Sequence, residues 1–78
     1  MSKTESQPAP ASVVVTINGE RSVVPAGLTL SELLGQLGVA NGKVAVERNR
    51  TIAPRSQFDS IMVAEGDELE IVRFVGGG

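Results

Sequence analysis

The sequence predicts an α+β fold in which one mixed β-sheet packs on a single main helix. Three stretches point to it: an Asn-Gly hairpin near the start, a capped amphipathic helix in the middle, and an apolar strand at the end. The order of elements is strand, strand, helix, strand, short pieces, strand, which is the order of a β-grasp with four to five strands. The first and last strands should lie parallel at the centre, because the intervening helix and strand supply the long connection that a parallel pair needs.

The first hairpin is indicated by its residue types. Ser12 to Asn18 is rich in β-branched residues, and Asn18-Gly19 is the two-residue signal for a type I′ turn. Glu20 to Val24 then returns as the partner strand. Pro25 ends that strand, because proline cannot donate a ladder hydrogen bond.

The main helix has the clearest local signal in the chain. Thr29 is an N-cap with Glu32 three residues later, which forms a capping box, and Gly38 is placed to close the helix in the left-handed conformation. Gly35 inside the helix costs about 1 kcal/mol relative to alanine, and close approach of another element would be one reason for it. The apolar residues fall at helical spacing on a single face: Leu30, Leu33, Leu34 and Leu37.

Several shorter elements are expected in the second half of the chain. Ser56 and Asp59 have the spacing of a second cap, which predicts one helical or 3₁₀ turn from Ser56 to Ile61 with Phe58 and Ile61 as its inward contacts. The other predicted elements are a strand at Val44–Arg48, a turn at Asn49-Arg50, an extended piece at Thr51-Ile52, a turn at Glu65-Gly66-Asp67 and the last strand at Glu68–Val75.

The last strand carries two apolar patterns. Leu69 and Ile71 alternate with glutamates as in a half-buried strand, but Val72 and Phe74 continue the apolar pattern on the opposite face. A bulge would restore the phase, and burial of both faces of a central strand would also explain it. The functional alternative is an exposed docking patch that includes Phe74.

Composition excludes several classes of function. Apolar residues make up 41% of the chain, but aromatic residues are limited to two phenylalanines, so the core must be aliphatic. The absence of cysteine and histidine removes thiolate chemistry, disulfides and most zinc sites. A net charge of −2 without a basic run argues against nucleic acid as a partner. There is no apolar run of bilayer length and no signal-peptide pattern, so we expect a cytoplasmic protein without a membrane partner.

The predicted domain organisation is one β-grasp domain between two simpler ends. Residues 1–11 are expected to be a disordered leader, because they hold no large apolar anchor, and residues 12–75 the domain. The chain ends in three glycines, Gly76, Gly77 and Gly78, which should form a flexible tail. Such a tail would present the α-carboxylate of Gly78 to a partner on a stalk thin enough to enter a narrow channel.

Several of these segments together carry a family resemblance. They are Ile17-Asn18-Gly19-Glu20, Thr29-Leu30-Ser31-Glu32-Leu33-Leu34, Val44-Ala45-Val46-Glu47-Arg48-Asn49, Ile52-Ala53-Pro54-Arg55-Ser56, and Glu65-Gly66-Asp67 leading to Phe74-Val75-Gly76-Gly77-Gly78. In this order the chain resembles the ThiS family of ubiquitin-like sulfur carriers of bacterial thiamine biosynthesis. The resemblance covers everything after the leader. The leader is longer than is usual in the family, and a third glycine follows the more general Gly-Gly ending.

The resemblance implies a mechanism in which the chain is a co-substrate and not an enzyme. A ThiF-like adenylyltransferase would use ATP and Mg²⁺ to adenylate the carboxylate of Gly78, and the chain itself would bind no cofactor and no metal. A persulfide from a sulfur-relay protein, such as a cysteine desulfurase, would then convert the end into a thiocarboxylate. A ThiG-like thiazole synthase would take the sulfur into the thiazole moiety of thiamine.

The folded body is expected to supply the affinity for these partners. Ordering three tail residues costs about 1–2 kcal/mol each in backbone freedom, so the glycines cannot supply it. We predict a docking patch of Val72, Phe74 and Val75, with Arg73 and Arg48 as polar contacts at its edge or as ordinary solvated surface.

Three other functions share this fold or this ending. The small subunit of molybdopterin synthase has the same terminal chemistry with a different acceptor. A ubiquitin-like modifier would become joined to lysines of its targets. A plain β-grasp interaction module would have a glycine tail with no chemistry.

Overall fold

The computed structural model describes residues 12–74, so the predicted leader, Val75 and the three terminal glycines lie outside the described residues. Within this range the strands are β1 (Ser12–Ile17), β2 (Glu20–Pro25), β3 (Val44–Arg48), β4 (Thr51–Ala53) and β5 (Glu68–Arg73). The helices are α1 (Leu30–Gln36) and two 3₁₀ turns, η1 (Asn41–Lys43) and η2 (Arg55–Gln57).

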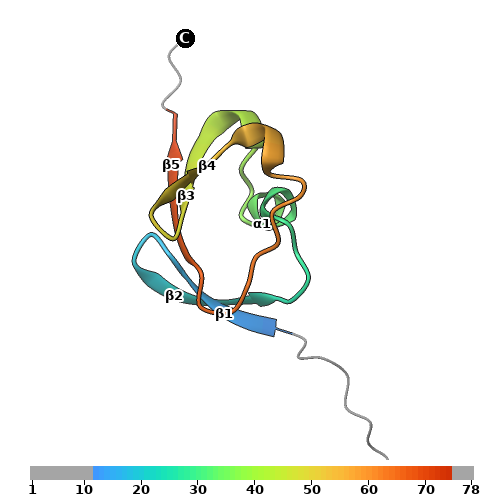
Figure 1. Cartoon of the computed structure of the whole chain (residues 1–78), viewed down its shortest axis with the longest axis vertical. Coiled ribbons are helices and arrows are strands. Elements are labelled where there is room, and N and C mark those ends of the chain that lie inside the picture. The colour runs from blue at the N-terminus through green and yellow to red at the C-terminus, as the bar shows by residue number, and fades with distance from the viewer. Residues whose placement is uncertain (1–11, 75–78) are drawn as a thin grey trace, which may run out of the picture.

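The five strands form one mixed sheet in the order β2-β1-β5-β3-β4 (Figure 1). Strand β5 lies at the centre, parallel to β1 on one side and antiparallel to β3 on the other. The sheet curves around α1, which lies on its concave side (Figure 1). This arrangement confirms the predicted β-grasp with its parallel central pair.

Tight turns connect β1 to β2 and β3 to β4. Asn18 and Gly19 have φ angles of 52° and 83°, as the predicted type I′ turn requires. Asn49 and Arg50 adopt φ angles of 52° and 70° between β3 and β4, although an arginine is strained in this region. The Asn49 side chain holds that turn in place, because its oxygen accepts a hydrogen bond from the backbone N–H of Glu68 at 2.9 Å.

The start of α1 agrees with the prediction, and its end differs in one residue. Thr29 and Glu32 form the capping box, with the Glu32 N–H donating to Thr29 Oγ1 at 3.1 Å and the Thr29 N–H donating to Glu32 Oε1 at 2.9 Å. Gly38 (φ 80°) closes the helix, and the backbone N–H of Val39 donates to the carbonyl of Leu34 in a Schellman motif. Leu37 was predicted on the apolar stripe but is 41% exposed, because the chain reverses after it and Val39 packs against the core in its stead.

Gly35 has no packing reason in the described structure. A Cβ atom built at this position meets nothing within 4 Å, so the suggested close approach of another element is wrong.

The core between α1 and the sheet is aliphatic apart from Phe58, which is 1% exposed. The segment after η2 clamps α1, since the N–H groups of Leu30 and Ser31 donate to the carbonyls of Ile61 and Phe58. Phe58 and Ile61 face inward as predicted, but η2 begins at Arg55 with Pro54 as a cap without a side-chain bond, so the predicted Ser56 cap is wrong.

The two apolar patterns of β5 have a simple explanation in the structure. Pairing with β3 runs without interruption from Leu69 to Arg73, so there is no bulge in this pair. Leu69 is buried, but Val72 and Phe74 are 57% and 51% exposed. Strand β5 is therefore central in the sheet, yet its outer face is uncovered within the described residues.

Candidate docking site at the end of the central strand

The start of β5 is fixed by the carboxylate of Asp67, which is 5% exposed. Its Oδ2 accepts hydrogen bonds from the Ala64 N–H at 2.8 Å and from Arg48 Nε at 3.0 Å. Its Oδ1 accepts from Asn49 Nδ2 at 3.1 Å. The loop before β5 and the turn after β3 are thereby held together.

These partners decide the charge state of Asp67. Burial alone would raise the pKa of this carboxyl group. The hydrogen bonds from Ala64, Arg48 and Asn49, together with the positive charge of Arg48, outweigh burial and hold the pKa of Asp67 below its ordinary value. The residue is a buried, hydrogen-bonded anion, and its role is to anchor the strand.

The far half of β5 is also aligned. The Asn18 side chain accepts a hydrogen bond from the Ile71 N–H at 2.7 Å and donates to the Ile71 carbonyl at 3.2 Å. On the other side, the Phe74 N–H donates to the Lys43 carbonyl at 2.8 Å. The strand therefore extends in a defined direction up to the last described residue.

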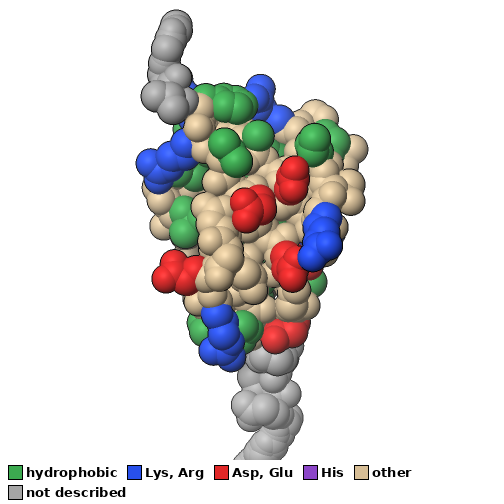
Figure 2. All heavy atoms as spheres, turned by 90° about the vertical axis from the view of Figure 1, so that its left-hand side faces the viewer, with side chains coloured by type: hydrophobic (Ala, Val, Ile, Leu, Met, Phe, Trp, Pro, Cys, Tyr) green, Lys and Arg blue, Asp and Glu red, His purple; other side chains and the backbone are tan. Residues whose placement is uncertain are grey.

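Exposed apolar side chains gather on the outer face of the sheet beside this end of β5. We call this set the outer patch: Ala45, Ile52, Val72 and Phe74. Ala45 lies directly opposite Val72 in the pairing of β3 with β5, and Ile52 on β4 is 70% exposed. Figure 2 shows green side chains gathered toward the top of this face, with acidic side chains directly below them. A hollow of about 170 Å³ lies among Ala45, Ile52 and Val72.

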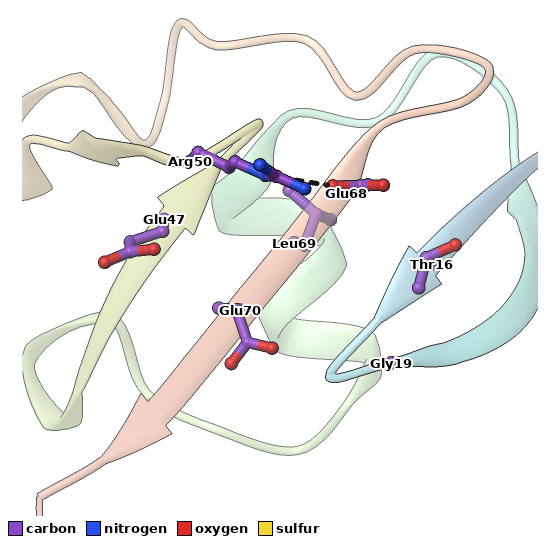
Figure 3. Close-up of a pocket in the computed structure, with 7 residues that line it drawn as sticks. All are labelled: Thr16, Gly19, Glu47, Arg50, Glu68, Leu69 and Glu70. Atoms are coloured by element: carbon purple, nitrogen blue, oxygen red, sulfur yellow. Dashed lines mark ion pairs between the residues drawn. The ribbon is translucent and has the colours of Figure 1, made fainter.

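Carboxylates border the outer patch toward the start of β5. Glu47 on β3 and Glu70 on β5 line the same hollow and face each other across the two strands. Arg50 lies farther along, with its Nε 3.9 Å from Glu68 Oε1 (Figure 3). The face thus has an apolar end near Phe74 and an acidic middle.

The structure places some of the predicted site residues together and separates others. Val72 and Phe74 are exposed on the same face of the sheet, as a docking patch requires. Arg73 lies opposite the buried Val44 and so on the other face, where it borders a hollow with Leu37. Arg48 is paired with the buried Asp67, although its own side chain is 34% exposed, so it anchors the start of β5 and is not a free contact at the edge of the patch.

The other predicted site residues, Val75, Gly76, Gly77 and Gly78, lie outside the described residues.

Ile52 and Ala45 are the members of the patch that sequence reasoning missed. A signal for Ala45 was present, since Val44 and Val46 alternate with Ala45 and Glu47 as inward and outward residues of one strand. Ile52 gave no such signal, because β4 has only three residues and alternation cannot be read over so short a strand.

The described residues contain no group of three or more acidic side chains placed to hold a metal ion. Within residues 12–74, no helix has the length and the apolar character needed to cross a membrane.

Comparison with known proteins gives the family. The model of the ThiS family matches residues 10–78, which include the last residue of the chain. A crystal structure of a thiamine biosynthesis protein (ThiS) from Geobacter metallireducens has a TM-score of 0.71 and 39% sequence identity, covering 85% of this chain and 100% of that chain. The sulfur carrier protein ThiS of Bacillus subtilis (strain 168) is 38% identical over 50 residues, which cover 64% of this chain and 76% of that protein.

A longer protein is also similar. A thiazole synthase from Paramagnetospirillum magneticum (strain ATCC 700264 / AMB-1) is 52% identical over 64 residues, which cover 82% of this chain and 20% of that protein. The chain therefore spans about a fifth of the length of that synthase. Together with the five-stranded sheet around one helix, the family match shows that the chain belongs to the ThiS family of sulfur carriers.

Proposed function

We propose that the chain carries sulfur as a thiocarboxylate on Gly78 and donates it for synthesis of the thiazole moiety of thiamine, in the cytoplasm. The observation that carries this proposal is the match to the ThiS family, which extends through the three terminal glycines. The similarity to a protein named thiazole synthase supports a ThiG-like enzyme as the acceptor.

The absence of cysteine supports this location of the sulfur. With no thiol in the chain, sulfur that it carries covalently has its most direct attachment at the terminal carbonyl carbon. A carboxylate is a poor acyl donor because its leaving group is bad, so it must first be activated. The chain has neither histidine nor cysteine. The family resemblance implies that a separate ThiF-like enzyme, which uses ATP and Mg²⁺, carries out this activation.

The proposed chemistry has three steps. In the first, an oxygen of the Gly78 carboxylate attacks the α-phosphorus of ATP and pyrophosphate leaves. In the second, the terminal sulfur of a persulfide on a relay protein, such as a cysteine desulfurase, attacks the acyl carbon and AMP leaves. In the third, a thiol of the sulfur donor attacks the resulting acyl disulfide, which leaves the thiocarboxylate on Gly78 and a disulfide on the donor.

The described residues would provide the surface that these partner enzymes bind. Val72 and Phe74 expose apolar surface immediately before the tail, and Ala45 and Ile52 widen it. Residues of this kind carry much of the binding energy in protein interfaces when they enter a pocket on the partner. Val75, the third residue of the predicted docking patch, lies outside the described residues and stays a prediction.

Mass spectrometry tests the proposal. Co-expression with a ThiF-like enzyme, a cysteine desulfurase and a sulfur source should replace one oxygen of the intact chain by sulfur, located at Gly78 by fragmentation. A chain lacking Gly78 is the control and should keep its mass and its melting temperature. An unchanged mass of the wild-type chain in the presence of active partner enzymes would refute the carrier role.

Complementation of bacterial deletion strains identifies the pathway that accepts the sulfur. Expression of the chain in a bacterial strain that lacks its own ThiS should restore growth without thiamine. Restoration of molybdoenzyme activity in a strain that lacks the small subunit of molybdopterin synthase would instead assign the sulfur to that pathway. Isopeptide-linked species of higher mass would indicate a protein modifier.

A further inference from the structure

We infer that Asn18 is a positioning residue for the reaction at Gly78, because its side chain sets the direction in which the end of β5 leaves the domain. The reaction itself rests on the proposed function. The contacts that position the strand come from the described residues. Asn18 lies in the hairpin turn between β1 and β2, and its partner, Ile71, follows 53 positions later in the chain.

The β1 side of β5 has no strand partner beyond Leu69. Parallel pairing with β1 ends where Ile17 meets Leu69. The chain then turns at Asn18 and Gly19, next to β5 (Figure 3). Ile71 pairs with β3 at a position that directs its N–H and C=O groups away from β3, toward the side that β1 has left. These two backbone groups therefore need a partner that no strand supplies.

The side chain of Asn18 takes the place of the missing strand residue. Its Oδ1 accepts a hydrogen bond from the Ile71 N–H at 2.7 Å, and its Nδ2 donates to the Ile71 carbonyl at 3.2 Å. Asparagine, aspartate and glycine all suit a turn position with positive φ, but only asparagine offers both a donor and an acceptor. The turn alone therefore does not require asparagine, whereas the double contact with β5 does.

Asn18 makes the last contact on this side of β5. The N–H and C=O groups of Arg73 point the same way as those of Ile71, and no hydrogen bond reaches them within residues 12–74. On the other side, the last contact is the Phe74 N–H, which donates to the Lys43 carbonyl at 2.8 Å. Removing the Asn18 side chain would leave the end of β5 attached to β3 alone.

A second asparagine makes the same kind of contact at the opposite end of the strand. Asn49, whose φ angle is also 52°, accepts a hydrogen bond from the Glu68 N–H at 2.9 Å and donates to Asp67 Oδ1 at 3.1 Å. Two asparagines in positive-φ turns therefore hold β5, one at its start and one in the half that leads to Gly78. Comparing the two separates a general effect on the strand from an effect on the tail.

The position of the strand end should affect binding more than chemistry. A strand end that is held on one side only frays, and a partner enzyme must order it on binding. The cost of this ordering raises the KM for the carrier. Once the strand is bound, Gly78 reaches the reactive site as before, so kcat is unchanged.

The test compares Asn18→Gly with the wild-type chain in ATP–pyrophosphate exchange by a ThiF-like enzyme. Glycine keeps the turn and removes both side-chain contacts. We expect KM for the carrier to rise about fivefold with kcat unchanged. Asn18→Asp, which keeps the acceptor for the Ile71 N–H and loses the donor, should give an intermediate KM. Asn49→Gly is the matched control, because it should lower the melting temperature at least as much and leave KM unchanged.

Amide hydrogen exchange tests the positioning without any enzyme. The Phe74 N–H is bonded on the β3 side, so it reports fraying of the strand end and not the direct loss of the Asn18 contact. It should exchange faster in Asn18→Gly than in the wild-type chain, and at the wild-type rate in Asn49→Gly. Wild-type exchange of the Phe74 N–H in Asn18→Gly would overturn the inference.

Two results of the enzyme assay would also overturn the inference and leave the carrier role standing. One is an unchanged KM for Asn18→Gly, with normal activity of the wild-type chain. The other is an equal rise in KM for Asn49→Gly, because general loosening of β5 would then be the cause. Absence of activity with the wild-type chain, by an enzyme that adenylates its own carrier, would instead refute the proposed function.

Discussion

Residues Leu69 and Val72 belong to the same strand of six residues, but the sheet gives them opposite environments. Leu69 points toward α1 and is 1% exposed, whereas Val72 points away and is 57% exposed. The inner face is covered by a helix of the same chain. The outer face carries comparable side chains that no described residue covers. Apolar character alone thus does not separate core residues from exposed ones, and the two faces should respond differently to the same kind of substitution.

The largest loss of stability is expected for a substitution on the inner face of the sheet. Leu69→Ala should lower the free energy of unfolding by about 2–5 kcal/mol, because it removes buried methyl groups and leaves a cavity in the core. Val72→Ala, on the outer face of the same strand, should lower it by less than about 1 kcal/mol. Urea denaturation followed by circular dichroism measures both. Equal losses at the two positions would show that the outer face is covered in solution.

A smaller loss of stability is expected when Asp67, which anchors the start of β5, is replaced. Asp67→Asn should lower the free energy of unfolding by about 1–3 kcal/mol, because the neutral amide cannot replace both carboxylate oxygens as acceptors for Arg48, Asn49 and the Ala64 N–H. Asp59→Asn, on an exposed carboxylate, is the matched control.

The same anchor predicts a pH dependence. The pKa of Asp67 is lower in the folded chain than its ordinary value of 3.8, so its contribution is fully present above that value. This stability is lost as the pH falls from 3.8 through the folded pKa. The wild-type chain should therefore lose more stability than Asp67→Asn in acid below pH 3.8, as measured by thermal denaturation across this range. Parallel pH profiles of the two chains would contradict the assignment.

Substitutions on the outer face of the sheet should lower the affinity of the chain for its partner enzyme. Val72→Ala and Phe74→Ala should each weaken binding of the adenylating enzyme by about tenfold, because each removes apolar contact area next to the tail. Val23→Ala is a matched control, since Val23 on β2 is 63% exposed but lies at the opposite edge of the sheet. Isothermal titration calorimetry measures all three. A fall in melting temperature of Phe74→Ala without a change in affinity would place Phe74 in the core.

The smallest effect is expected on the outer side of the helix. Gly35→Ala should raise the free energy of unfolding by up to about 1 kcal/mol, because alanine is a better helix former and its Cβ meets no atom within 4 Å. Thermal denaturation measures the gain. A decrease would show that this side of α1 also has a packing partner.

The sequence by itself determined the elements whose causes are local. The capping box of Thr29 and Glu32, the Asn18-Gly19 turn and the left-handed Gly38 each depend on a few neighbouring residues, and all are found in the structure. The order of these elements also determined the β-grasp, because a parallel central pair requires the long connection that the helix provides.

Only the tertiary structure decided which apolar and charged side chains stay exposed. Val72, Ile52 and Leu69 are all aliphatic, but only Leu69 is buried, because burial depends on which other residues cover a side chain. Arg48 could be assigned to Asp67 only after folding brought together two residues 19 positions apart. In the same way, pairing of β3 with β5 set Glu47 against Glu70. Secondary-structure propensity acts over a few neighbouring residues. Burial and charge pairing depend instead on contacts between distant parts of the chain.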